Sequence, residues 1–209
     1  MAYNVLVVDD QNIPRRLFEM IVRESDRYNL LFALESAAVA PIYCARYRVD
    51  LVIMDIVMND GSNGLDAAER IKKDYPSTKV LIVTSMIESA YLARAKSIGA
   101  DGFWYKEAGD RELIEVMDRI MSGESVFPDN APTLNIGMAR SAEFTPAEIA
   151  VLREMTTGAS NKEIAERLFI EVGTVKVHIS HMLQKTGYKN RTELAIEARI
   201  RGLVVGEKT

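Results

Sequence analysis

The chain has 209 residues, more than one domain usually holds, so two domains are expected. Its composition, 48% hydrophobic and 27% charged, is that of a globular protein with real hydrophobic cores. The single Cys44 excludes an intrachain disulfide framework. Without a signal peptide or an apolar run of membrane-spanning length, we expect a soluble, cytoplasmic protein with no membrane partner. The net charge of −4 argues against a protein that binds nucleic acid over its whole surface. The charge is unevenly distributed, however, because residues 141–209 carry 10 basic and 9 acidic residues and so have a net charge of +1.

Five β-α units are predicted in the first 122 residues, because apolar runs alternate with segments of helical periodicity. The predicted strands cover residues 3–8, 30–33, 51–55, 80–83 and 102–105, and the predicted helices cover residues 12–23, 41–47, 65–75, 88–98 and 110–121. This alternation predicts a parallel sheet with right-handed crossovers and helices on both faces. The run 51–55 is apolar until it ends in Asp55, as is typical of a strand buried on both sides.

Reactive side chains follow the carboxyl ends of four predicted strands, namely Asp9 with Asp10, Asp55, Thr84 and Lys106. In an open parallel sheet these ends form one crevice, so three acids, a hydroxyl and an ammonium would meet there. Crowded carboxylates repel one another unless a cation neutralises them, and a few carboxylates with room for water favour Mg²⁺ over Ca²⁺. A carboxylate can attack phosphorus, and Asp55, alone on the central strand, is the expected nucleophile. The alternative is that these acids only cap the following helices.

After residue 122 the periodicity lapses. Residues 123–142 contain two glycines and two prolines and are predicted to form a linker that could include one short helical turn. Residues 143–209 are predicted to form a small domain of four helices, the first of which begins with a capping box of Thr145 and Glu148. Two short helices joined by a tight connection predict a helix-turn-helix, and the second carries basic residues and no acid. Its basic residues and those just after it are Lys176, Lys185, Lys189 and Arg191.

The first half resembles the receiver domain of bacterial two-component response regulators, over about residues 3–122. The resemblance is carried by Val5-Leu6-Val7-Val8-Asp9-Asp10, Asp55, Thr84 and Gly102-Phe103-Trp104-Tyr105-Lys106. It implies a flavodoxin-like (βα)5 fold in which Asp55 accepts a phosphoryl group. It also implies Mg²⁺ ligands, namely Asp10 as the main acid, Asp9 in support, Asp55, and the backbone carbonyl of Val57. Thr84 would bind a phosphoryl oxygen, Lys106 would pair with the phosphoryl group, and Phe103 would be the aromatic switch residue.

The loop after the third strand departs from that family. Met58-Asn59 stands where the family usually has Met-Pro, and the loop through Gly64 is one residue longer than usual. Because the missing proline would have fixed one turn, we expect this loop to be more mobile.

The second half resembles the LuxR-type helix-turn-helix, and with the receiver it resembles the NarL/FixJ class. The carrying motifs are Phe144-Thr145-Pro146-Ala147-Glu148, Gly158-Ala159-Ser160-Asn161-Lys162-Glu163-Ile164-Ala165, Gly173-Thr174-Val175-Lys176-Val177-His178 and Asn190-Arg191-Thr192-Glu193-Leu194. By this resemblance residues 172–185 form the recognition helix in the major groove. The residues implied to face DNA are Lys176, Val177, Ser180 and His181, and those implied to touch its backbone are Asn161, Thr174, Lys185 and Arg191. Glu171 stands where Ser or Thr is usual. An acid at a helix N-terminus stabilises the helix, and its charge would also repel a nearby phosphate.

We therefore expect a transcription regulator that uses Mg²⁺, is phosphorylated on Asp55 by a sensor histidine kinase, and pairs as a homodimer on double-stranded DNA. RNA polymerase is a further candidate partner. We do not expect an enzyme beyond a receiver that catalyses its own phosphorylation and dephosphorylation. Two alternatives stay open, a phosphohydrolase or phosphotransferase with an aspartyl-phosphate intermediate and a DNA-binding regulator whose receiver no longer responds to phosphate. A substrate pocket in the second half would favour the enzyme, whereas the strand-end residues weigh against the constitutive regulator.

Overall fold

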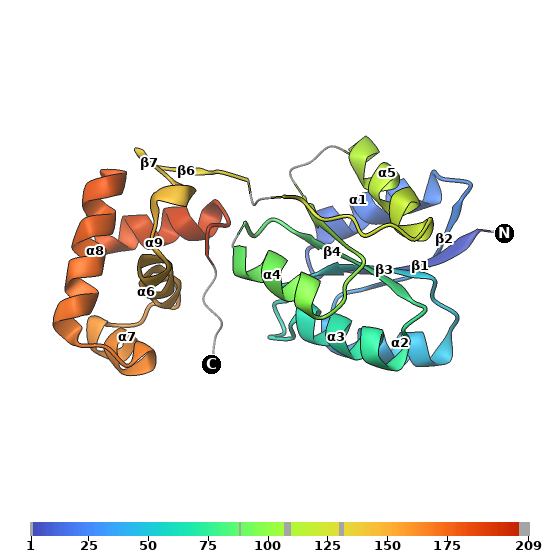
Figure 1. The fold of residues 1–209 in the computed structure, drawn as a ribbon, viewed down its shortest axis with the longest axis horizontal. Coiled ribbons are helices and arrows are strands. Elements are labelled where there is room, and N and C mark those ends of the chain that lie inside the picture. Colours follow the sequence, from blue (N-terminus) through green and yellow to red (C-terminus); the bar gives the residue numbers. More distant parts are fainter. Residues whose placement is uncertain (1, 88, 107–109, 130–131, 205–209) are drawn as a thin grey trace. The chain divides into compact units, whose positions relative to one another are not determined.

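The structure is a computed structural model that describes residues 2–87, 89–106, 110–129 and 132–204. The chain divides into two compact units, Met1–Ser85 with Ser89–Asn130 and Met86–Glu88 with Ala131–Thr209. The elements of each unit are shown in Figure 1. Among the described helices, none is both long enough and apolar enough to span a membrane.

The first unit is built on a parallel sheet of five strands in the order β2-β1-β3-β4-β5. The strands are β1 (Tyr3–Val8), β2 (Tyr28–Leu34), β3 (Leu51–Asp55), β4 (Lys79–Thr84) and β5 (Gly102–Tyr105). All five residues of β3 are buried, which explains why its sequence is an unbroken apolar run. Thr84 pairs with Tyr105, and Asp55 pairs with Val83, so the strands end together at one edge. The predicted parallel sheet is confirmed.

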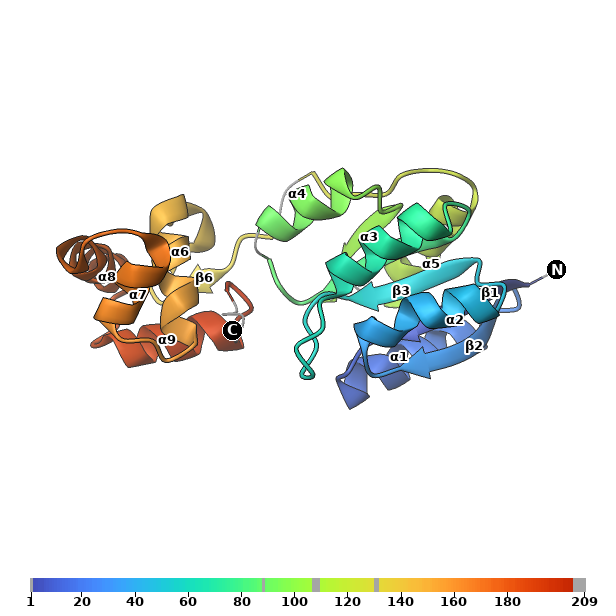
Figure 2. The same cartoon turned by 90° about the horizontal axis from the view of Figure 1, so that it is seen from below.

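Helices cover both faces of this sheet, as the alternation predicts. They are α1 (Asn12–Arg23), α2 (Ala40–Arg46), α3 (Gly64–Asp74), α4 (Ser89–Ser97) and α5 (Asp110–Met121), with a 3-10 turn at Ala37–Val39. In Figures 1 and 2, α1 and α5 lie on one face and α2, α3 and α4 on the other. Phe18 of α1 and Trp104 of β5 meet edge to face in the core beneath α1 and α5. Helix α4 was predicted from Glu88, which lies outside the described residues.

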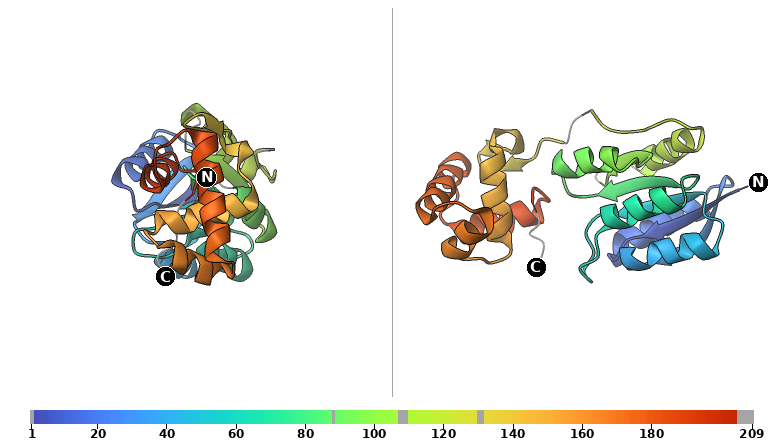
Figure 3. Two further views of the ribbon diagram at one scale, coloured as in Figure 1. Left: turned by 90° about the vertical axis from the view of Figure 1, so that its left-hand side faces the viewer. Right: turned by 60° about the horizontal axis from the view of Figure 1, so that its bottom comes forward.

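The described part of the second unit is a helical bundle preceded by a short hairpin (Figure 3). Its elements are β6 (Asn135–Ile136), β7 (Ala139–Arg140), a 3-10 turn at Ser141–Glu143, α6 (Pro146–Thr156), α7 (Asn161–Leu168), α8 (Val172–Thr186) and α9 (Arg191–Ile200). The predicted capping box of Thr145 and Glu148 is confirmed, and Ser160 with Glu163 forms a second one at α7. These caps fix where α6 and α7 begin, and hence the geometry of the helix-turn-helix.

Parts of the predicted linker, residues 123–142, are ordered against one unit or the other. Val126 forms a parallel bridge with Gly102 of β5, and its carbonyl accepts the Phe103 N–H at 2.9 Å. Within the second unit, the Met138 N–H donates to the Thr186 carbonyl at 2.9 Å. The 3-10 turn at Ser141–Glu143 agrees with the single short turn that the sequence allows. The borders of the domains themselves stay a prediction.

Candidate functional site

Three carboxylates converge at the carboxyl edge of the sheet. Asp9 and Asp10 follow β1 and Asp55 ends β3, and these two strands are hydrogen-bonded neighbours. One oxygen from each acid lies within 4.8 Å of the others. Asp9 is fully buried and Asp55 is 3% exposed, so water does little to screen their charges from one another. The convergence predicted from the strand ends is therefore present.

Lys106, which follows β5, reaches across to two of these acids. Its Nζ lies 2.8 Å from Asp9 Oδ2 and 2.9 Å from Asp55 Oδ2. Burial and the charge of Asp9 raise the pKa of the Asp55 carboxyl to about 6, although Lys106 and the Ile56 N–H act in the opposite direction. Burial lowers the pKa of Lys106, but the two carboxylates outweigh it, so that pKa is raised overall. One ammonium facing three acids leaves the site short of positive charge.

Asp10 has one engaged oxygen and one buried oxygen without a partner. Its Oδ2 accepts the backbone N–H of Asn59, and its Oδ1 makes no hydrogen bond to any residue that the structure describes. A buried acceptor left unpaired is unfavourable, and a cation at Oδ1 would remove that penalty. The oxygen ligands and the excess negative charge both fit Mg²⁺. Val57 forms a bridge with Asn63, and nothing in the structure tests its carbonyl as a ligand.

The predicted switch residues lie on β4 and β5. Thr84 is 1% exposed, and its carbonyl accepts the Lys106 N–H at 3.0 Å. Phe103 is 2% exposed and packs edge to face against Tyr105, with ring centroids 5.1 Å apart. By the resemblance Phe103 is the aromatic switch residue, and in this structure its ring is turned inside. Its role as a switch therefore depends on a second, outward position.

Two features of this edge escaped sequence reasoning. A Cβ on Gly64 would lie 1.7 Å from the Asp55 carbonyl oxygen, so only glycine permits the loop to return so close to the acceptor strand. The hydroxyl of Tyr105 is buried with no hydrogen-bond partner among the described residues, and burial raises its pKa to about 12. Gly64 could have been recognised as a close-approach glycine, whereas no sequence signal marks the Tyr105 hydroxyl.

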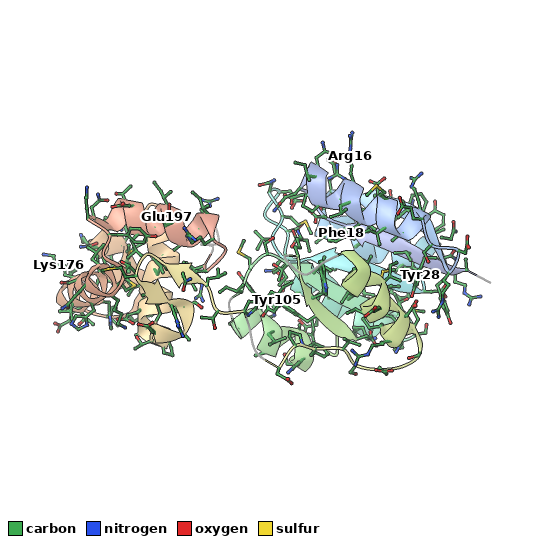
Figure 4. The ribbon with its side chains drawn as sticks, turned by 90° about the horizontal axis from the view of Figure 1, so that it is seen from above. Arg16, Phe18, Tyr28, Tyr105, Lys176 and Glu197 are labelled. Atoms are coloured by element: carbon green, nitrogen blue, oxygen red, sulfur yellow. The ribbon has the colours of Figure 1, made fainter. Side chains whose placement is uncertain are left out.

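A second candidate site is the outer face of α8. Lys176, Val177, Ser180 and His181 are all exposed, and they share one side of the helix because they recur at a spacing of about four residues. Figure 4 shows Lys176 directed away from the helical unit. The buried face consists of Val175, Ile179, Met182 and Thr186. Thr174 is exposed in the first turn, and His178 is half-buried, so it lies between the exposed and the buried faces of α8.

Two cations predicted to touch the DNA backbone are engaged within the domain. Lys185 Nζ binds both carboxylate oxygens of Glu148, at 2.9 and 2.7 Å, and the Glu143 carbonyl at 2.9 Å. Arg191 donates to Asn161 Oδ1 and, at 2.6 Å, to the Ala159 carbonyl. These contacts favour a structural role for Lys185 and Arg191, and whether they also touch DNA stays untested. They escaped prediction because the sequence shows charge but not the partner that neutralises it.

Comparison with known proteins agrees with both halves. Residues 5–118 match the response regulator receiver domain, and residues 142–198 match the bacterial regulatory proteins of the luxR family. Response regulator protein VraR of Staphylococcus aureus (strain NCTC 8325 / PS 47) is 32% identical over 203 residues, which are 95% of this chain and 97% of VraR. Oxygen regulatory protein NreC of Staphylococcus carnosus (strain TM300) is 30% identical over 203 residues, 91% of this chain and 94% of NreC.

Solved structures agree at the level of the fold. A structure of two RcsB dimers bound to two parallel DNAs covers 95% of this chain and 98% of its own, with a TM-score of 0.59 and 19% identity. The response regulator ChrA, from a heme-sensing two-component system, covers 97% and 99%, with a TM-score of 0.52 and 23% identity. The order of receiver and helix-turn-helix, the matched families and the full-length relatives lead to one conclusion. The chain belongs to the two-component response regulators of the NarL/FixJ class, which control transcription.

Proposed function

We propose that Asp55 is the phospho-acceptor and that its phosphorylation controls the binding of this chain to DNA. The observation that carries the proposal is the meeting of Asp55 with Lys106 and the unpaired Asp10 oxygen at one edge of the sheet. Asp55 Oδ1 accepts the Ile56 N–H, so its carboxylate is held at the end of β3. The carboxylate attacks phosphorus, the bond from phosphorus to the leaving group of the donor breaks, and an acyl phosphate forms. A histidine kinase is the proposed donor.

The acids in this site have distinct tasks. Asp10, with Asp9, Asp55 and the Val57 carbonyl, would hold Mg²⁺, which neutralises the carboxylates and the phosphoryl oxygens when bound. Lys106 would transfer its ion pair from the two acids to a phosphoryl oxygen, and Thr84 would donate its hydroxyl to another. Because the receiver supplies the acceptor and the electrostatics, it would catalyse only its own phosphorylation and dephosphorylation. A hydrolase acting on other substrates is the weaker alternative. The described part of the second unit, four helices and a short hairpin, does contain a hollow of about 350 Å³ beside Arg191 and Arg199, but its lining includes no acid, histidine or cysteine that could act on a substrate.

The second unit is proposed to read double-stranded DNA through α8. Lys176 and His181 offer donors, Ser180 offers a hydroxyl, and Val177, 51% exposed, offers an apolar contact for a thymine methyl group. A module of this size reads few base pairs, so two copies on repeated half-sites are needed for useful specificity. The exposed Ile196 and Ile200 of α9 are the proposed seam between two DNA-bound copies. The sensor kinase and DNA would both reach this chain in the cytoplasm, where RNA polymerase is a further candidate partner.

Phosphorylation of Asp55 is tested by intact-mass spectrometry after incubation with acetyl phosphate and Mg²⁺. The wild-type chain should gain the mass of one phosphoryl group, and the Asp55→Asn variant should gain none. Asp60→Asn is a matched control, because Asp60 is an exposed carboxylate in the loop just beyond the site. An equal mass gain in the Asp55→Asn protein would show that the acceptor lies elsewhere.

The DNA-facing side of α8 is tested by Lys176→Ala, with Lys162→Ala on α7 as a matched exposed lysine. Loss of a base contact should cost about 1–3 kcal/mol of binding free energy and relax specificity at one position. Loss of a phosphate contact should weaken binding evenly across sequences and reduce the salt slope by about 1. A Lys176→Ala chain with wild-type affinity and salt dependence would mean that another face of α8 meets DNA.

A further inference from the structure

The loop after β3 makes a specific contact with the predicted metal ligand Asp10. The backbone N–H of Asn59 donates to Asp10 Oδ2, across 49 positions of sequence. The other oxygen, Oδ1, is buried and unpaired among the described residues, and Asp10 lies with Asp9 and Asp55 in the acidic cluster. The two oxygens of Asp10 therefore have different roles, because one is fixed by the loop and the other is left for a cation.

The loop itself is braced, so the Asn59 amide is presented from a defined position. The Gly64 N–H donates to the Ile56 carbonyl at 2.7 Å, and Val57 forms an antiparallel bridge with Asn63. Within the loop the Gly61 N–H donates to the Met58 carbonyl at 3.1 Å, in a turn where Gly61 has φ +82°. Figure 2 shows this segment projecting beyond the end of β3.

We propose that the Asn59 backbone amide is a positioning donor that holds Asp10 in the orientation required to bind Mg²⁺. This inference depends on the proposed metal site. A proline at position 59 has no N–H and could not make the contact, whereas any other residue could. The departure from Met-Pro therefore supplies a hydrogen bond at the site. Partners that orient a metal ligand in this manner commonly change metal affinity by about 10-fold or more when they are removed.

The test is isothermal titration calorimetry of Mg²⁺ into the wild-type, Asn59→Ala and Asn59→Pro chains. Asn59→Ala keeps the N–H and should bind as the wild type does, while Asn59→Pro should bind about tenfold more weakly. Equal affinity in Asn59→Ala and Asn59→Pro would overturn the inference. No Mg²⁺ binding by the wild type would overturn the proposed metal site as well.

A second readout does not depend on introducing proline. In the metal-free wild type, the Asn59 amide should exchange its hydrogen slowly, because Asp10 accepts it. In Asp10→Ala that exchange, followed by NMR, should be roughly tenfold faster. An unchanged rate would show that the contact does not form in solution, and it would remove the basis of the inference.

A separate set of contacts joins the predicted switch residue to the segment after α5. The Phe103 N–H donates to the Val126 carbonyl at 2.9 Å, and the Val126 N–H donates to the Asp101 carbonyl at 3.0 Å. Val126 is 8% exposed and belongs to the core beneath α1 and α5. A Cβ on Gly102 would lie 2.5 Å from Ile120 Cδ1 and 3.1 Å from the Val126 carbonyl oxygen. Glycine at 102 is what allows the segment to lie this close to β5.

We infer that residues 124–127 form a latch, held on β5 in the unphosphorylated chain and loosened when Asp55 is phosphorylated. Lys106 directly follows β5 and its Nζ lies 2.9 Å from Asp55 Oδ2, so a phosphoryl group on Asp55 would change a contact at the end of the strand that holds the latch on its outer edge. The inference depends on phosphorylation at Asp55, as proposed above. In physical terms, phosphorylation of Asp55 would be coupled to a change between two discrete packings of residues 124–127 on the edge of the sheet.

The latch would set the length of the tether between the two units. The second unit holds the chain again from Leu134, whose carbonyl accepts the Ser141 N–H at 2.7 Å. A chain anchored at Val126 and Leu134 can span at most about 28 Å, whereas one released back to Gly123, whose N–H donates to the Ile120 carbonyl of α5, can span about 39 Å. Opening the latch thus gives each DNA-binding unit more freedom to pair with a second copy on DNA.

The test compares NMR-detected amide exchange of Phe103 and Val126 in the full chain, with and without Mg²⁺ and beryllofluoride, a phosphoryl mimic. We expect both amides to exchange about tenfold faster with the mimic, together rather than separately. Unchanged or slower exchange would overturn the latch. If acetyl phosphate labels Asp55 while these amides do not respond, the latch fails and the proposed function stands.

Variants test the latch without phosphorylation. Val126→Asp places a charge in the core and should release the segment, while Ser125→Asp adds the same charge at an exposed neighbour. Small-angle scattering should show a larger maximum dimension for the Val126→Asp chain than for the wild type, and no increase for Ser125→Asp. Fluorescence of Trp104, the single tryptophan, reports whether the receiver is still folded. If Val126→Asp does not fold, Phe127→Ala is a milder variant for the same test. Equal dimensions in folded Val126→Asp and Ser125→Asp would contradict the tether argument.

Discussion

Asp55 is held in a position that favours its chemistry and not the stability of the receiver. Burial and the neighbouring Asp9 raise the pKa of its carboxyl from 3.8 to about 6, despite Lys106. A pKa higher in the folded chain than in the unfolded chain stabilises the fold at low pH, and this contribution is lost as pH rises through about 6. At pH 7.5, without metal, the ionised carboxylate therefore destabilises the receiver.

Asp55→Asn should accordingly stabilise the metal-free receiver. At pH 7.5 we expect the free energy of unfolding to rise by about 1–3 kcal/mol, since each pKa unit corresponds to about 1.4 kcal/mol. The gain should shrink as the pH is lowered from about 6 to below 3.8, where Asp55 becomes protonated in the unfolded chain as well as in the folded one. Urea unfolding in EDTA, followed by Trp104 fluorescence, measures it. Asp129→Asn, at an exposed carboxylate, should have no effect, and a destabilised Asp55→Asn receiver at pH 7.5 would contradict the account.

The site residues that could be predicted are those that a reactive side chain at the end of a strand identifies. Asp9, Asp55 and Lys106 follow apolar runs, and parallel pairing brings the ends of such runs together without further information. The Asn59 amide was not predictable, because a backbone N–H belongs to every residue except proline and only the folded loop selects one. The present position of the Phe103 ring could not be predicted, because a sequence does not specify which of two packings is populated.

At the scale of elements, the turn between α7 and α8 contains the single described non-glycine residue with positive φ. Phe169, at φ 54°, ends α7 in the left-handed conformation, and its side chain is 95% exposed. Left-handed backbone costs a residue with a Cβ roughly 1 kcal/mol, and the exposed ring recovers none of it through burial.

Phe169→Gly should therefore stabilise the helical unit by about 0.5–1 kcal/mol. Phe169→Ala retains the Cβ and hence the strain, so it should change stability little. Hydrogen exchange of the buried α7 and α8 amides measures both variants. Equal stabilisation by alanine and glycine would mean that the ring, and not the backbone, is unfavourable here.

The junction between α6 and α8 depends on Glu148. Burial raises its pKa, but Lys185 and the Thr145 N–H outweigh that effect, and the pKa of the carboxyl is lowered overall. A lowered folded pKa adds stability above the unfolded value near 4.3, and that stability is lost as pH falls through the folded pKa.

Glu148→Gln should reduce the stability of the helical unit by about 1–3 kcal/mol at pH 7, because it leaves the Lys185 ammonium without its counter-charge. The difference from wild type should narrow below about pH 4. Glu166→Gln is the control, since Glu166 makes only an exposed pair with Lys162 on α7. Exchange rates of buried α6 and α8 amides report the result, and an effect no larger than that of the control would rule out this junction as a stabilising contact.

Long elements were predictable and short ones were not. The strands and helices of the receiver were located from apolar runs and helical spacing, mostly to within one or two residues. The hairpin β6–β7 has two residues per strand, too few to show a period. It is fixed by tertiary contact, since Gly137 at φ +60° lies so close to the Thr186 carbonyl that a Cβ would be 2.1 Å from it. A linker prediction from composition could not include such a contact.

At the scale of the whole molecule, the central claim is that the state of Asp55 decides where the chain binds DNA. The claim joins two sites that the sequence places in separate halves, and it needs no particular arrangement of the two units. It does require that phosphorylation of the acceptor carboxylate changes how the exposed face of α8 binds DNA.

Genome-wide mapping of binding sites for the wild-type and Asp55→Asn chains, expressed at equal levels under the conditions that activate the kinase, tests this claim most directly. The account predicts that the wild type enriches a limited set of sites that share an inverted or direct repeat, and that Asp55→Asn loses most of that enrichment while remaining folded. The same sites with the same enrichment in both chains would contradict it, and would identify the protein as a DNA-binding regulator whose receiver does not respond to phosphate.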